Sequence, residues 1–115
     1  MLLDVGDKIL VAHRRLFEAD ETRFFVGRVD GYEAGLVKVS GWSYVHDVVS
    51  GSIVGKDEIR TKIISLSSGT LIVYQLPRHL ALEGVEFGFA DGRLRLTDGA
   101  GFTMNLSEVP VRGTL

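Results

Sequence analysis

Residues Val85 to Thr97 read Val-Glu-Phe-Gly-Phe-Ala-Asp-Gly-Arg-Leu-Arg-Leu-Thr, with apolar side chains at every second position on either side of Asp91-Gly92. A period of two is typical of β-strands that bury one face. Asp-Gly accepts the positive φ angles of a two-residue hairpin turn. The stretch therefore predicts two antiparallel strands joined by a tight turn.

The same alternation continues after this hairpin. Phe102, Met104 and Leu106 alternate with Thr103 and Asn105, which predicts a third strand. The three strands form a meander with one apolar face, and the rest of the chain is the available partner for that face. Closing the sheet into a barrel would also remove exposed strand edges.

The front of the chain shows strands of the same kind, expected at residues 8–12, 22–29 and 36–45. Asp30-Gly31 and Ala34-Gly35 mark a turn between the second and third of these strands. Gly41 interrupts the third strand and indicates a bulge or a bend.

The quoted elements Gly6-Asp7-Lys8-Ile9-Leu10-Val11, Gly27-Arg28-Val29 and Gly35-Leu36-Val37-Lys38-Val39 resemble the opening of SH3-like small barrels. In that group a first strand, a long loop and a tight meander are typical. The resemblance covers about residues 5–45, and it implies a fold without assigning a function.

The middle of the chain is less regular. The apolar segment from Val45 to Val54 is either a small hairpin over Ser50-Gly51 or a lid over the barrel end. Residues 59–66 and 70–76 flank Ser67-Ser68-Gly69, which indicates a hairpin. Residues 78–83 predict one helical turn that ends at Gly84.

Composition supports a single all-β domain over residues 1–115: a small barrel with an SH3-like front meander, a C-terminal three-stranded meander and at most one short helical turn. Val, Ile and Thr, which suit a pleated surface, make up 26 of the 115 residues, and 14 glycines supply turns. The expected core comprises Ile9, Val11, Phe25, Val37, Val39, Ile63, Ile72, Tyr74, Phe87, Phe89, Leu94, Leu96, Phe102 and Met104.

Charge and segment patterns exclude several classes of protein. The net charge of −2 argues against a nucleic-acid-binding protein, which carries a basic footprint. No stretch approaches the roughly 20 apolar residues that span a membrane. The first residues lack the pattern of a secretory signal, so we expect a cytoplasmic protein.

The sequence predicts no metal, no cofactor and no catalytic residue. His13, His46 and His79 are too far apart to form a local metal motif. Gly51 to Asp57 imitates a phosphate-binding loop, but it has one residue too few between its glycines and an acidic residue after the lysine. The sequence contains no Gly-x-Ser-x-Gly motif for a nucleophilic serine.

The candidate site is an aromatic and basic barrel end. Tyr32, Trp42 and Tyr44 are expected there because rings attract cations and flat ligands, although Trp42 could instead fill the core with Tyr44 at its rim. Arg14 and Arg15 precede the second strand and add positive charge. We therefore expect a non-catalytic binding or assembly module that recognises a segment of a protein partner.

Two further expectations concern the segment from residue 46 to 58. His46 and Asp47, with the apolar residues that follow, could form the pocket of a small-ligand-binding protein or an enzyme. The same segment, or an edge strand, could pair with a second copy of the chain, which predicts a homo-oligomer.

Overall fold

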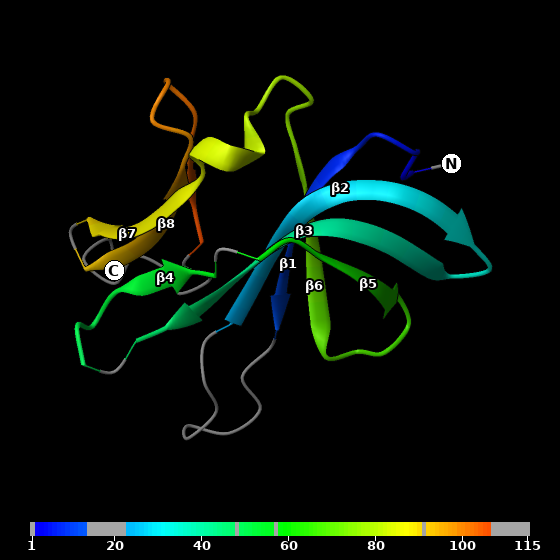
Figure 1. Cartoon of the computed structure of the whole chain (residues 1–115), viewed down its shortest axis with the longest axis horizontal. Helices are drawn as coiled ribbons and strands as arrows, with labels where there is room; N and C mark the ends of the chain where they lie inside the picture. Colours follow the sequence, from blue (N-terminus) through cyan, green and yellow to red (C-terminus); the bar gives the residue numbers. More distant parts are fainter. Residues whose placement is uncertain (1, 14–22, 48, 57, 91, 107–115) are drawn as a thin grey trace, which may run out of the picture.

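The computed structural model describes residues 2–13, 23–47, 49–56, 58–90 and 92–106, and these residues form an all-β fold (Figure 1). The predicted all-β class is confirmed. The one helical element in the described part of the chain is the 3-10 turn η1 (Leu82–Gly84), which ends at Gly84 as expected but begins later than the helical turn expected over residues 78–83. The strands are β1 (Lys8–His13), β2 (Arg23–Glu33), β3 (Leu36–His46), β4 (Ile53–Gly55), β5 (Arg60–Ser65), β6 (Leu71–Leu76), β7 (Glu86–Ala90), β8 (Arg93–Thr97) and β9 (Thr103–Asn105).

The first sheet contains six strands, all antiparallel to their neighbours. Its order is β4-β3-β2-β1-β6, and β5 pairs with the front half of β3. The hairpin expected around Ser67-Ser68-Gly69 is wrong, because β5 pairs with β3 whereas β6 pairs with β1. Across the described residues, the pairings run from β4 through β3, β2 and β1 to β6, with β5 joined to β3.

The β2–β3 hairpin is the longest element of this sheet, and two glycines allow it to curve. Gly27 and Gly41 face each other across the two strands. A Cβ atom on Gly41 would lie 1.9 Å from the carbonyl oxygen of Val26, so no larger residue fits without a backbone shift. The bend expected at Gly41 therefore depends on a close approach of two backbones. The turn itself is Ala34-Gly35, where both residues have positive φ.

Both faces of the first sheet are apolar at its centre. On β1, Ile9 and Val11 point to one side, and Leu10 points to the other. Successive residues of a strand point to opposite faces, so a continuous apolar run must be covered on both. The inner cluster, on the concave side, contains Ile9, Val11, Phe25, Val29, Val37, Val39 and Ile64.

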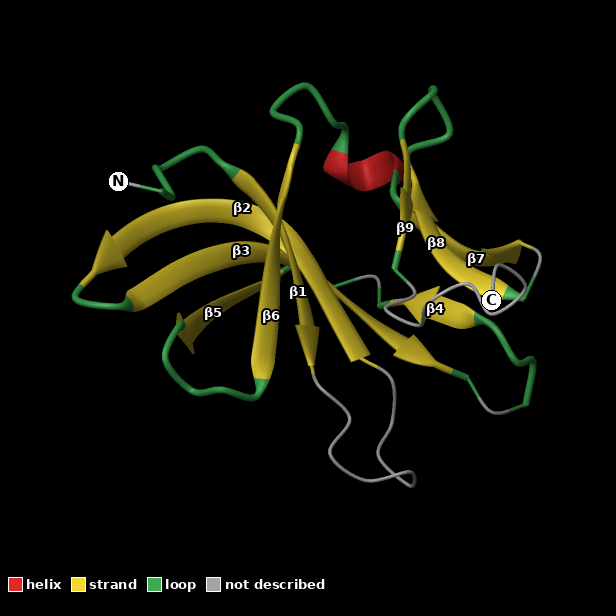
Figure 2. Cartoon of the chain, turned by 180° about the vertical axis from the view of Figure 1, so that it is seen from behind, coloured by secondary structure: helices red, strands yellow, loops and turns green. Residues whose placement is uncertain are grey.

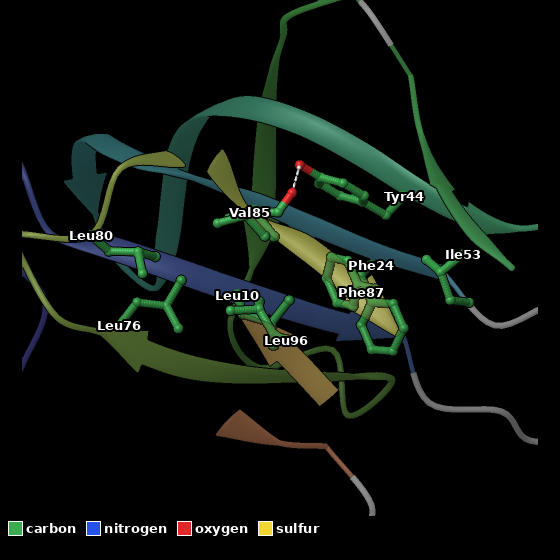
Figure 3. Packing of buried hydrophobic residues seen from close by; sticks show 10 residues of the cluster. Leu10, Phe24, Tyr44, Ile53, Leu76, Leu80, Val85, Phe87 and Leu96 are labelled. Carbon is green, nitrogen blue, oxygen red and sulfur yellow. Dashed lines mark hydrogen bonds between the residues drawn. The ribbon is translucent and has the colours of Figure 1, made fainter. Parts of the chain in front are cut away.

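The second sheet, β7-β8-β9, covers the other face (Figure 3). Phe87 and Leu96 pair across β7 and β8 and pack against Leu10 and Phe24 of the first sheet. The rings of Phe24 and Phe87 stack, with 4.8 Å between their centroids. The C-terminal meander is thus present and buries its apolar face as expected. Figure 2 shows η1 where the chain passes from β6 to this second sheet.

Three of the expected core residues are not in the core. Ile63 is 70% exposed while its neighbour Ile64 is 7% exposed, because the pairing of Ile64 with Val37 puts the odd-numbered residue on the outer face. Ile72 is 37% exposed, near the start of β6. Phe89 shares a face with Phe87 but lies next to the hairpin turn, where it remains 58% exposed.

Asp7 ties the beginning of the chain to the segment that leaves β6. Its buried carboxylate accepts hydrogen bonds from the backbone N–H of Asp4 at 2.8 Å and from Arg78 at 2.7 Å. Gln75 donates a third hydrogen bond at 3.3 Å, and Lys8 donates to the carbonyl of Leu80. The hydrogen bond from Asp4 and the neighbouring Arg78 guanidinium lower the pKa of Asp7.

We expect Gly41→Ala to lower the free energy of unfolding by about 3 kcal/mol, since the added methyl group collides with backbone atoms rather than with a movable side chain. Urea denaturation monitored by circular dichroism measures the change. Gly88→Ala in β7 is the matched control, because nothing lies within 4 Å of its added Cβ. Equal losses in the two variants would contradict the proposed close approach.

We expect Asp7→Asn to be less stable than the unchanged protein at pH 7 and to approach it at pH 3. The pKa of Asp7 is lower in the folded chain, so its carboxylate stabilises the fold above its unfolded-state pKa and ceases to do so as the pH falls through its folded-state pKa. Urea midpoints at the two pH values measure this. Asp4→Asn, which keeps the backbone N–H donor, serves as the control, and a pH-independent gap would refute the role of Asp7.

Candidate functional site

A hollow of about 370 Å³ lies where the end of the first sheet meets the route to the second sheet. Trp42 and Tyr44 of β3 line it on one side, as do Gly55 and Lys56 at the end of β4. The residues around η1 form the opposite side, through Leu82, Glu83 and Val85. Two of the predicted site residues therefore meet in one cleft.

Tyr44 is part of the core rather than an exposed ligand contact. Its side chain is 9% exposed, and its ring lies 4.7 Å from that of Phe87. The hydroxyl donates to the carbonyl of Val85 at 3.4 Å (Figure 3). Burial, with a smaller effect of Glu86, raises the pKa of Tyr44, so its hydroxyl remains protonated at neutral pH.

Trp42 lies on the same face of β3 as Tyr44, because it is two residues away. It packs at the edge of the cluster shared by the two sheets and is only partly buried. Tyr44, rather than Trp42, therefore fills the core, and Trp42 lies at its edge. Trp42 retains a ring surface that a ligand in the hollow would contact.

Gly55 brings β4 against the aromatic wall of the hollow. It pairs with Tyr44, and a Cβ at this position would lie 2.7 Å from the Tyr44 ring. The residues between β3 and β4 form the hairpin over Ser50-Gly51 that the sequence allowed, rather than a lid.

Asp47 holds the turn of this β3–β4 hairpin. Its carboxylate accepts hydrogen bonds from the N–H of Val49 at 3.1 Å and from the hydroxyl of Ser50 at 3.0 Å. Its carbonyl oxygen accepts from the N–H of Gly51 at 2.8 Å. The hydrogen bonds to the carboxylate, first that from Val49 and then that from the Ser50 hydroxyl, lower the pKa of Asp47. His46, beside it, pairs with Ile53 on β4.

The other predicted site residues do not join Trp42 and Tyr44. Tyr32 pairs with Val37 near the β2–β3 turn, and that register puts it on the face of the inner cluster. There it lines a separate cleft of about 540 Å³ together with Leu3, Leu66 and Val73. Arg14 and Arg15 lie outside the described residues. The predicted self-association also stays a prediction.

A basic groove of about 330 Å³ adjoins the hollow and shares Tyr44 and Lys56 with it. Its walls come from the end of β1, the beginning of β2, the end of β3 and the chain around β5. No acidic residue is among those that line it in the described structure. Its cationic and titratable side chains are His13, Arg23, Lys56, Arg60 and Lys62.

The positive charges in the basic groove repel one another. Partial desolvation, followed by the charges of Arg60, Arg23 and Lys56, lowers the pKa of Lys62. Desolvation, then Arg23 and Lys62, likewise lowers the pKa of His13. The Lys62 ammonium lies 4.7 Å from the centroid of the Phe25 ring, which supplies a cation–π contact.

The sequence analysis missed this groove because its members come from four separate stretches of an acidic chain. The alternation of side chains along a strand could have revealed part of the groove. Arg60 and Lys62 are two residues apart and therefore share a face of β5, and Arg23 lies opposite Val45 on the neighbouring pair of strands. The pairing of β5 with β3, which brings the two groups together, could not be read from the sequence.

Comparison with known proteins adds no relative, since no family model, no curated protein and no solved structure matches this chain. In the part of the chain that the structure describes, no three His, Asp or Glu side chains form a group that could hold a metal. None of the described helical residues makes a helix long and apolar enough to cross a membrane. The geometry of the hollow at Trp42 and of the basic groove is therefore the basis for proposing a function.

We expect Arg23→Gln to raise the pKa of His13 toward its ordinary value, because one of the charges that oppose protonation is removed. NMR titration of the His13 ring measures the shift. Because the pKa of His13 is lower in the folded chain than in the unfolded chain, the fold loses stability as the pH falls below the unfolded-state pKa of His13. The Arg23→Gln variant should lose less stability over this pH range. Arg28→Gln, on the same strand, is the control, and an equal effect there would contradict the groove geometry.

Proposed function

We propose that this protein is a non-catalytic binding module that takes a segment of a partner protein into the hollow at Trp42. The observation that carries the proposal is the partly buried ring of Trp42 in a cleft whose walls come from both sides of the sheet junction. A volume of about 370 Å³ is at the low end of ligand pockets, which favours one anchoring side chain of a larger partner.

The chemistry of the hollow favours recognition over catalysis. Leu82 and Val85 supply apolar surface, and Lys56 and Glu83 supply one charge of each sign. Aromatic residues dominate binding energy when they are centred in such apolar surroundings. Tyr44 is the one other titratable group that lines the hollow in the described structure. Its hydroxyl is already engaged in a hydrogen bond to the carbonyl of Val85.

The alternative of an enzyme or small-ligand pocket at His46 has less support. The carboxylate of Asp47, which would act with His46, is engaged by Val49 and Ser50 in the turn.

Trp42 is the sole tryptophan of the chain, so its fluorescence reports directly on the hollow. We expect peptides selected from a random displayed library on the folded protein to change this emission. Trp42→Leu keeps an apolar side chain and should weaken their binding by about tenfold or more, as loss of an aromatic anchor does, while the circular dichroism spectrum is unchanged. Affinity is measured by calorimetry, which does not need the tryptophan.

Tyr32→Leu is the matched control, because it removes another exposed ring near the far end of the same hairpin. Binding to this variant should equal that of the unchanged protein. An equal loss in both variants, or selected peptides that leave the emission of Trp42 unaltered, would overturn the proposed site.

A further inference from the structure

The basic groove is unusual because the chain as a whole is acidic. Thirteen Lys and Arg residues face fifteen Asp and Glu residues in the sequence, yet four of the thirteen converge on one groove. Among the described residues, the carboxylate paired with this group is Glu58, which lies 3.2 Å from Arg60 on the surface. Arg23, Lys56 and Lys62 face the groove itself.

Holding these charges together costs stability. The side chains come from β2, from the end of β4 and from β5, so three separate pairings of β3 bring them to one place. Lys62 is partly desolvated over the Phe25 ring. A bound anion would remove the repulsion, and anions of suitable geometry form charge-assisted hydrogen bonds with arginine and lysine.

The groove and the hollow of Trp42 share Lys56 and Tyr44 in their linings. Apart from these two, Trp42 and the charged side chains of the groove lie on opposite faces of the first sheet. Trp42 packs with the cluster that faces the second sheet, whereas Arg23 and Lys62 lie on the face of the inner cluster, where Lys62 contacts Phe25. The groove is therefore a binding surface separate from the hollow.

We propose that the basic groove recognises the carboxylates of an acidic protein segment. The recognised pattern is two or more Asp or Glu residues close together in an extended stretch. The confined volume of the groove, about 330 Å³, favours such a segment over nucleic acid, which is bound along extended basic stripes.

Two matched probes test the proposal: a peptide of about ten residues that contains Asp and Glu, and its Asn and Gln counterpart. Binding is followed by calorimetry. At low salt the acidic peptide should bind about tenfold more tightly or better, and the advantage should disappear toward 0.5 M NaCl, about the range in which salt screens exposed charges.

The variant Arg23→Gln with Lys62→Gln should abolish the preference for the acidic peptide. Arg93→Gln with Arg95→Gln on β8 removes the same charge from the second sheet and should preserve the preference. Circular dichroism establishes that both double variants are folded. An equal loss in the β8 variant would mean that net charge, rather than the groove, drives binding, and would overturn the inference.

The remaining outcomes separate this inference from the proposed function. Equal affinity for the two peptides would overturn the inference and leave the function proposed for the Trp42 hollow untouched, since the displayed library tests that function. Tighter binding of an oligouridine RNA would identify a nucleic-acid groove instead and would also overturn the inference.

Discussion

The neighbouring strands β1 and β2 are buried on both faces at their centres, and the rest of the fold follows from this constraint. Ile9 and Val11 bury one side of β1, and Leu10 buries the other. Each side needs its own cover. The curved first sheet covers its own concave side, and the C-terminal meander covers the opposite side through Phe87 and Leu96. Apolar burial at about 25 cal/mol per Å² makes this double cover the main source of stability.

The same constraint explains how much of the fold could be predicted. Where a strand buries one face, as in the C-terminal meander, alternation predicts both the strands and their inner side, and the structure agrees at Phe87 and Leu96. Where apolar residues are consecutive, the pattern does not define a face. At Ile63-Ile64 the choice depends on the register with β3, which is a long-range property of the fold.

The candidate site, like the fold, could be predicted only where a local strand pattern defines which residues share a face. Trp42 and Tyr44 could be placed together because they are two residues apart on one strand. Tyr32 was grouped with them because it is near in sequence, but the β2–β3 register carries it to the other face and toward the turn. The basic groove depends on a pairing between β3 and β5 that no local pattern encodes. Overall charge conceals such a groove, because a net value averages over positions that the fold later separates.

In the first sheet β1 lies between two strands that are far apart in the sequence. Its neighbours are β2, which follows it closely, and β6, which begins at Leu71. During synthesis β1 leaves the ribosome long before β6, so its second edge stays unpaired until β6 has been made. Contacts between such distant residues make folding slow and leave an apolar edge open to other chains in the meantime.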